Sequence, residues 1–441
     1  MEPSSTAATV ALSLPELVRK ILEFYFGVQY WGDRPASVSA IRLWSNPDAY
    51  RHLGEVPPER RQIYASKIRN IEVWDSSKHC NLSALEGLEF PRLKHLMTDV
   101  PSIDSFNKHQ MKPFCVRLLR TFIYHGERVS TELLELLRDN CPNLKHALLS
   151  TYKEQPPTAS FAGFIQSMPF LETFIFTTAR IASTPPSPTV DGDLLSSLAR
   201  RSNLVILQLP WPWSRDAAVS ATRQLVDVES HREARPFPSL MSLTLSVPSN
   251  AMSKLASMLT NLSRLHLVIK TSDGDAIEPL RELVNLTRLQ VMFGETVYIP
   301  GASLAALATL SKLESLILAP LHPVWINVTS SFSDADLELV ASHWPRLHSL
   351  VFGIHCAVSG RGFRSLSSHC RELRRWEMSG PLQVDELLSE NLGGPPLFPK
   401  LEYLRFAGFA GVMYNMNTDR FEARQRDDGV VFFTLFNDVL V

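Results

Sequence analysis

A short stretch begins at Phe237 and reads Phe237-Pro238-Ser239-Leu240-Met241-Ser242-Leu243-Thr244-Leu245. From its first leucine onward it follows the pattern Leu-x-x-Leu-x-Leu. Successive side chains of a β-strand point to opposite faces, so Leu243 and Leu245 share one face while Ser242 and Thr244 share the other. The stretch therefore predicts a strand with one apolar and one polar face.

The same pattern occurs twelve times along the chain, with a clear copy at Phe398-Pro399-Lys400-Leu401-Glu402-Tyr403-Leu404-Arg405-Phe406. The spacing is 22 residues from Leu240 to Leu262 and 36 residues from Leu204 to Leu240. Most spacings fall in the range of about 20–29 residues that is typical of leucine-rich repeats, and the longer ones indicate loop insertions. The first leucines of the copies are Leu93, Leu119, Leu144, Leu171, Leu204, Leu240, Leu262, Leu286, Leu313, Leu347, Leu373 and Leu401.

Helix-like stretches lie between the copies. Residues 131–137, 303–307 and 334–340 each carry apolar residues at the i, i+3, i+4 spacing of a helix. Ser333 or Asp334 is the expected cap of the last one, because a short polar side chain accepts from the free backbone N–H groups of a helix start. Each repeat is expected to be one strand and one helix, which bury their apolar faces by stacking on neighbouring repeats.

These repeats predict an α/β leucine-rich-repeat solenoid, a curved horseshoe with parallel strands inside and helices outside. An ordinary doubly wound α/β domain is the alternative, but it would not repeat one leucine pattern at every strand. Two insertions interrupt the repeats. Residues 177–190 are rich in proline and serine and predict an exposed loop. Residues 210–236 carry Trp211 and Trp213, which either anchor a partner or pack back over the solenoid edge.

The composition excludes several classes of protein. The chain has 441 residues, of which 45% are apolar and 20% charged, and its 44 basic and 45 acidic residues give a net charge of −1. Without a global basic field, neither nucleic acid nor an anionic membrane surface is expected as a partner. No apolar run approaches the roughly 18 residues of a membrane-spanning helix.

The cysteines and histidines show no chemical motif. The five cysteines are scattered and form no Cys-x-x-Cys pair, and no convincing signal peptide precedes them, so we expect a reducing compartment, cytoplasm or nucleus. Cys141 and Cys370 open two repeat copies, where a buried thiol packs as a small hydrophobe. His343, His348 and His355 are expected to be surface residues. Since no catalytic motif occurs, we expect no enzyme, no cofactor and no metal.

The N-terminal segment carries a second resemblance. Leu14-Pro15-Glu16-Leu17 opens a stretch in which Leu17, Ile21 and Phe24 share one helix face. The sequences Trp31-Gly32-Asp33-Arg34-Pro35-Ala36 and Ile41-Arg42-Leu43-Trp44 follow, and residues 59–69 lead into a strand expected at 68–73. This segment resembles the F-box of filamentous-fungal F-box/leucine-rich-repeat proteins, which are substrate receptors of cullin–RING ubiquitin ligases.

The resemblance implies a small helical F-box-like cap that docks on a Skp-type adaptor and its cullin scaffold, while the solenoid of a single receptor chain holds a protein substrate. Only Gly27-Val28-Gln29 stands where a second box helix would lie, so the box is shortened. The alternative is a stand-alone leucine-rich-repeat scaffold or inhibitor whose N-terminal helices only seal the first repeat. The adaptor-binding residues that the resemblance implies are Leu14, Pro15, Glu16, Leu17, Ile21, Leu43 and Trp44.

We therefore expect a disordered segment at 1–10, the F-box-like segment at 11–60, the solenoid at 61–408 and a C-terminal tail or cap at 409–441. The third and fifth positions of each Leu-x-x-Leu-x-Leu copy face away from the core. In the later repeats they form a basic concave face suited to an acidic or phosphorylated peptide; the alternative is a solvated face with no dedicated ligand. The candidate residues of this face are Arg264, His266, Arg288, Gln290, Arg375, Glu377, Tyr403 and Arg405.

Overall fold

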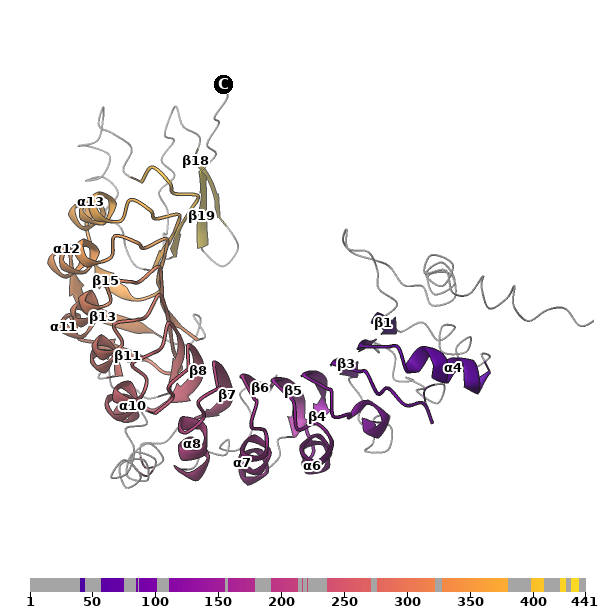
Figure 1. Ribbon diagram of the computed structural model, residues 1–441. Helices are drawn as coiled ribbons and strands as arrows, with labels where there is room; N and C mark the ends of the chain where they lie inside the picture. The colour runs from indigo at the N-terminus through magenta and orange to yellow at the C-terminus, as the bar shows by residue number, and fades with distance from the viewer. Residues whose placement is uncertain are drawn as a thin grey trace, which may run out of the picture. The chain divides into compact units, whose positions relative to one another are not determined.

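A computed structural model describes the chain in segments (Figure 1). The described residues are 40–43, 57–74, 85, 87–100, 111–154, 158–178, 192–212, 216, 220, 236–270, 276–321, 327–379, 398–407, 421–425 and 430–435. They divide into two compact units, Met1–Pro188 and Thr189–Val441. The division falls inside the proline- and serine-rich insertion at 177–190.

Unit 1 is a parallel sheet whose strands pair in chain order, with helices along one of its sides (Figure 1). Its strands are β1 (Ala40–Leu43), β2 (Asn70–Trp74), β3 (His95–Val100), β4 (Thr121–Arg128), β5 (His146–Glu154) and β6 (Thr173–Thr178). Its helices are α4 (Pro58–Ala65), the 3-10 turn η3 (Lys112–Phe114), α6 (Thr131–Asn140) and α7 (Thr158–Ser167).

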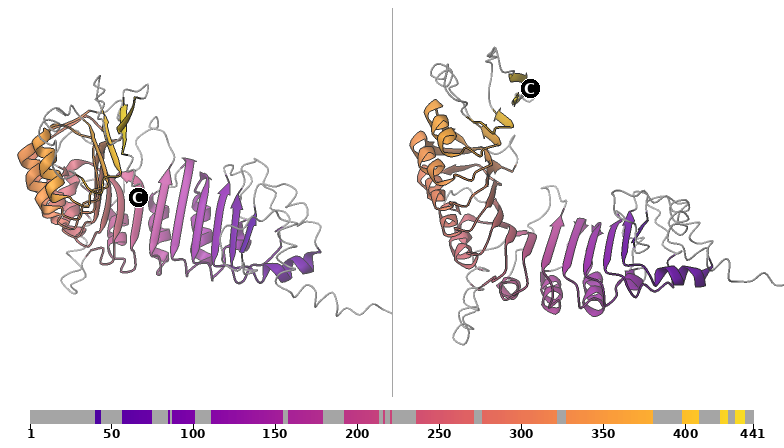
Figure 2. Two further views of the ribbon diagram at one scale, coloured as in Figure 1. Left: turned by 90° about the horizontal axis from the view of Figure 1, so that it is seen from above. Right: turned by 45° about the horizontal axis from the view of Figure 1, so that its top comes forward.

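Unit 2 has the same construction, and Figure 2 shows its strands side by side with the helices along one side of them. The parallel strands are β7 (Ile206–Pro212), β8 (Ser242–Val247), β9 (Arg264–Ile269), β10 (Arg288–Phe293), β12 (Ser315–Pro320), β14 (Ser349–Phe352), β16 (Arg375–Ser379) and β17 (Tyr403–Ala407). The helices are α8 (Gly192–Ala199), η4 (Ser249–Ala251), α10 (Met252–Met258), η6 (Glu278–Glu282), α11 (Gly301–Ala305), η7 (Ala306–Thr309), α12 (Asp334–His343) and α13 (Gly360–His369).

The sheet of unit 2 ends in two antiparallel strands. Strand β19 (Val430–Leu435) pairs antiparallel with β17, and β18 (Phe421–Gln425) pairs antiparallel with β19. The sequence predicts only a tail or cap over 409–441. These two strands occupy the edge that β17 would otherwise leave open, which is the usual task of a terminal cap in a stacked repeat.

All twelve strands predicted from the leucine pattern are present, and each begins two residues after the first leucine of its copy. The paired strands stay in register, so that Leu243, Leu265 and Leu289 align across β8, β9 and β10. Each of these leucines is at most 2% exposed. Burying one leucine contributes about 1.5–3 kcal/mol, so the aligned layers hold neighbouring repeats together.

The start of the sheet differs from the prediction. Ala40–Leu43 is expected to belong to a helical segment, but it forms β1 and pairs in parallel with β2. The strand expected at 68–73 begins at Asn70, after helix α4. The missed signal is the same six-residue pattern with β-branched residues, Val38-Ser39-Ala40-Ile41-Arg42-Leu43, because Val and Ile fill the leucine positions of a strand equally well.

The helical side of unit 2 is more varied than one helix per repeat. Three repeats add a second, parallel sheet of β11 (Val297–Ile299), β13 (Val328–Ser333) and β15 (His355–Ala357), which the sequence does not predict. The N-cap of α12 is Ser333, which is one of the two residues expected to cap this helix. Its N–H donates to Asp336 Oδ2 at 2.9 Å.

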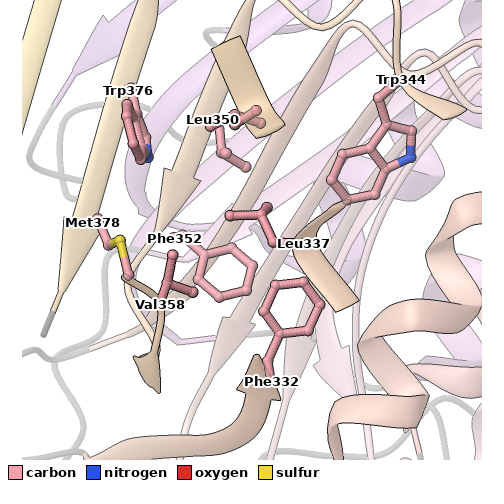
Figure 3. Close-up of a pocket in the computed structure, with 9 residues that line it drawn as sticks. Phe332, Leu337, Trp344, Leu350, Phe352, Val358, Trp376 and Met378 are labelled. Carbon is pink, nitrogen blue, oxygen red and sulfur yellow. The ribbon is translucent and has the colours of Figure 1, made fainter. Parts of the chain in front are cut away.

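The interior of the repeats around α12 and α13 is filled by large apolar side chains (Figure 3). Phe332, Phe352, Trp344 and Trp376 surround a cavity of about 10 Å³, and Trp344 Nε1 donates to the Leu307 carbonyl at 3.1 Å. A cavity of this size without free polar groups holds no ordered water. The described interior of these repeats is therefore closely packed.

Candidate protein-interaction face

The candidate site lies on the outward face of the parallel sheet in unit 2. Strand alternation decides which side chains reach it: on β9, Leu265, Leu267 and Ile269 are buried, whereas Arg264 and His266 are not. The same alternation runs along β10, where Leu289 and Val291 are buried. The face is therefore built from the third and fifth positions of each Leu-x-x-Leu-x-Leu copy, as the sequence predicts.

Arg264 and Arg288 are register partners on the paired strands β9 and β10. Neighbouring strands lie about 4.8 Å apart, so the two Cα atoms are close enough for one anionic group to meet both guanidinium groups. Both side chains are exposed. Within the described part of the chain, neither has a carboxylate within ion-pair distance. This pair is an uncompensated local positive charge on a chain of nearly neutral net charge.

The next outward position holds His266 beside Gln290, again as register partners. Burial lowers the pKa of His266 below its ordinary value, so the ring is neutral at pH 7. Its Nε2 atom is covered by protein and has no hydrogen-bond partner among the described residues. The arginine pair therefore lies beside neutral, polar side chains, which add no competing charge.

Arg375 differs from the other two arginines. Its Nε donates to Glu377 Oε1 at 2.8 Å, a second nitrogen of the guanidinium group contacts the same oxygen, and its Cζ lies 5.3 Å from the centre of the Tyr403 ring. Glu377 is only 13% exposed, so this pair is partly shielded from water. Arg375, Glu377 and Tyr403 thus satisfy one another, and their positive charge is largely compensated.

The predicted basic face is therefore not one continuous patch. Ser315 and Ser349 occupy the register positions between Arg288 and Arg375, on β12 and β14. Arg288 and Arg375 are therefore three strand spacings apart, which is about 14 Å. Arg405 lies on β17 opposite Glu377 in the register; nothing more is described of its side chain. Of the four predicted arginines, the structure brings Arg264 and Arg288 together as a pair.

The sequence-predicted adaptor-binding residues lie almost entirely outside the described part of the chain. Leu14, Pro15, Glu16, Leu17, Ile21 and Trp44 are in segments of which nothing is described. Leu43 is the last residue of β1. Trp211 lies on β7, but nothing is described of its side chain. Trp213 lies outside the described residues.

The described residues contain no cluster of three or more histidine, cysteine or acidic side chains that could hold a metal ion. Of the described helices, none has both the length and the apolar character needed to cross a membrane. Four cysteine thiols are buried and unpaired. Burial raises the pKa of Cys370 to about 12, which keeps that thiol protonated and unreactive.

The stacked repeats, their parallel strands in register and the helices on the other side define a leucine-rich-repeat fold. No family model matches the sequence, and no curated protein matches it. Similar solved structures include an internalin of Listeria monocytogenes, at 14% identity over 80% of this chain and 89% of that chain, with a TM-score of 0.45. Another is a leucine-rich-repeat protein of Leptospira interrogans, at 13% identity over 83% of this chain and 89% of that one, with a TM-score of 0.40. These likenesses are distant, and the class of the fold follows from the chain's own strands.

Proposed function

We propose that this chain is a non-catalytic receptor that holds a protein partner on the sheet face of unit 2, and that it serves as the substrate-recognition subunit of a cullin–RING ubiquitin ligase. The observation that carries the recognition role is the exposed pair Arg264 and Arg288, in register on β9 and β10 and without an acidic partner in the described part of the chain.

The chemistry of this pair favours an acidic or phosphorylated segment of the partner. A guanidinium group is planar and permanently charged, and it binds a carboxylate or phosphate through two parallel hydrogen bonds. Two such groups on adjacent strands, about 4.8 Å apart at their Cα atoms, can bind one dianionic group together. Since the net charge is −1, this recognition is local and does not extend to polyanions in general.

The ligase role rests on the sequence resemblance alone. The N-terminal Leu14-Pro15-Glu16-Leu17 would dock on a Skp-type adaptor, and the cullin scaffold would bring the ubiquitin-transferring subunits to the bound substrate. The chain itself would act as one copy in that complex, in the cytoplasm or nucleus, and would make or break no bond. Helix α4, between the motif-bearing segment and β2, is compatible with a linker of this kind.

One observation favours the alternative, a stand-alone leucine-rich-repeat scaffold. Ile41-Arg42-Leu43-Trp44 resembles the end of an F-box, yet Ala40–Leu43 is a strand paired with β2. A segment that extends the sheet would cap the solenoid, and Leu43 lies in this strand and not in a helix of the F-box-like segment that the resemblance implies. The two functions differ in whether residues 14–21 bind an adaptor.

The recognition role is tested with the full chain and the double variant Arg264→Glu with Arg288→Glu. A matched control reverses Arg346 and Arg371, two exposed arginines in the turns that precede β14 and β16. In a quantitative pull-down followed by mass spectrometry, the first variant should lose the partners of the wild type, while the control keeps them. Equal capture by all three proteins would show that this face is not the recognition surface.

The adaptor role is tested by titrating purified Skp-type adaptor into the full chain. Leu17→Asp with Ile21→Asp should abolish binding, because both residues lie on the proposed docking face, whereas Arg19→Asp on the opposite face should not. Inserting a box helix between Phe26 and Tyr30 should strengthen the binding. If the wild type and the insertion variant both fail to bind, the stand-alone scaffold becomes the better description.

A further inference from the structure

The outward sheet face of unit 1 carries an apolar row that crosses four strands. Met97, Ile123, Leu148 and Ile175 are successive register partners on β3, β4, β5 and β6. All four are partly exposed, because strand alternation places them on the side opposite the core residues Phe122 and Phe174. Four aligned apolar side chains on an open sheet face are more than scattered surface hydrophobes, which need no explanation.

A row of cations borders this apolar row. Arg69, Lys94, Arg120 and Lys145 immediately precede β2, β3, β4 and β5, and backbone hydrogen bonds of 2.7–2.8 Å link each N–H to the carbonyl of the preceding member. Lys145 pairs with Glu172 at 2.5 Å. In the described part of the chain, Arg69, Lys94 and Arg120 have no carboxylate within ion-pair distance.

Two histidines on the outward face lie next to this row of cations. Between the cations and the apolar row lie His95 and His146, and His146 Nδ1 is 3.1 Å from Thr173 Oγ1. Partial burial lowers the pKa of His95, and the nearby charges of His146, Lys94 and Arg120 lower it further. The apolar row therefore has a basic border, in which Lys145 is paired while Arg69, Lys94 and Arg120 have no ion-pair partner among the described residues.

The spacing of these rows selects the shape of an occupant. The apolar row repeats every strand, about 4.8 Å, while an α-helix presents one side chain per turn, about every 5.4 Å. An extended segment laid along the row would present same-side residues only every 6.6–6.8 Å or so. At β3, β4 and β5 the cation precedes the residue of the apolar row by three positions, about 10 Å, which is close to the diameter of a helix.

We propose that the sheet face of unit 1 binds an amphipathic α-helix of a partner protein, laid across β3–β6 with its apolar side chains on the Met97–Ile175 row and its carboxylates against Lys94 and Arg120. In this arrangement the row contacts the apolar side chains at positions i, i+3, i+4 and i+7 of the bound helix, as other helix-binding surfaces do. It goes beyond the recognition role above, since Arg264 and Arg288 belong to unit 2 and take no part in it.

The test uses the full chain and a fluorescein-labelled stapled peptide of about 16 residues, long enough to cover the row and pre-formed as a helix. It carries leucine on one face and glutamate on the neighbouring face. Anisotropy titrations should show saturable binding. Affinity should fall about tenfold or more for Lys94→Glu with Arg120→Glu, and likewise for Ile123→Asn with Leu148→Asn. Circular dichroism melts establish that each variant is folded.

Arg264→Glu with Arg288→Glu is the matched control and should bind the peptide as the wild type does, so failure of the unit 2 site is distinguishable from failure of this one. A scrambled peptide of the same composition should bind at least tenfold more weakly. Several outcomes would overturn the proposal. The proposal is wrong if the peptide does not bind saturably, if the scrambled peptide binds with equal affinity, or if both unit 1 variants bind with unchanged affinity. Dimerisation of the wild type that Ile123→Asn with Leu148→Asn abolishes, or adsorption to anionic vesicles that Lys94→Glu with Arg120→Glu abolishes, would also overturn it.

Discussion

Asp334, the first residue of α12, accepts a hydrogen bond from the backbone N–H of Ser359 at 2.8 Å, and Ser359 is the N-cap of α13. The second oxygen of the same carboxylate accepts from the Ser359 hydroxyl. One carboxylate therefore joins the starts of two successive helices, which lie 25 residues apart in the chain. Gly362 permits this approach, because a Cβ there would lie 2.5 Å from Asp334 Oδ1.

Replacing Asp334 with alanine should destabilise unit 2 by about 1–3 kcal/mol, because the Ser359 N–H loses its acceptor in a partly buried place. Urea unfolding measures the loss, and hydrogen exchange should show that it is concentrated in α13. Glu338→Ala is the control, since Glu338 lies on the exposed side of α12 and meets Arg361 only at 3.7 Å. A cost below that of the control would exclude the link between the helices.

Leu265→Ala should cost about 2–5 kcal/mol, as large-to-small changes in a packed core do. Leu265 is 2% exposed and aligns with Leu243 and Leu289 in neighbouring strands. Val268→Ala changes a partly exposed side chain on the opposite face of the same strand and should cost about 1 kcal/mol or less. Chemical denaturation of both variants separates the stacked core from the sheet face; similar costs would contradict the layered packing.

The buried thiols should be inert in the folded protein. Burial raises the pKa of Cys370 to about 12, and burial together with Asp334 raises that of Cys356 to about 12. Iodoacetamide at pH 8 should therefore label neither residue until urea unfolds the chain, as peptide mass spectrometry can show. A reductant should leave the melting temperature unchanged. A drop of many degrees with reductant would mean that disulfides support the fold.

The same shifts predict a loss of stability at alkaline pH. Between about pH 9, where the unfolded thiols lose their protons, and pH 12, where the folded ones do, the folded state binds more protons than the unfolded state. The free energy of unfolding should therefore fall as the pH rises through this window. Urea unfolding of the wild type and Cys370→Ala at pH 8 and pH 10.5 checks this, since the variant should lose less between the two values.

His266 predicts the opposite trend at acid pH. Burial lowers its pKa, so below the ordinary value of 6.5 the unfolded state binds a proton that the folded state does not. Stability should fall as the pH drops through that value. His266→Gln keeps a polar side chain without titration and should show a flatter pH dependence between pH 7.5 and 5.5. Parallel curves for the two proteins would mean that His266 titrates normally.

The repeats could be predicted from the sequence because each obeys a local rule. Leucine at the first, fourth and sixth positions buries one face of a strand, and this rule located all twelve predicted strands, each of which begins two residues after its first leucine. The expected helices at 131–137 and 334–340 follow from the same kind of periodicity and are confirmed as α6 and α12. The outward direction of Arg264 and Arg288 follows from strand alternation, which needs no tertiary information.

Long-range pairing decided the rest. The compensation of Arg375 by Glu377 and Tyr403 requires the register of β16 with β17, and the link between Asp334 and Ser359 joins repeats through the space between two helices. The apolar row from Met97 to Ile175 exists only because four strands align, since each of its residues is a single hydrophobe in its own repeat. A periodic pattern specifies which face a side chain takes, because that depends on its nearest neighbours in sequence. Which charges are neutralised and which rows are formed depends on residues about 25 positions away, and only the packed structure brings those together.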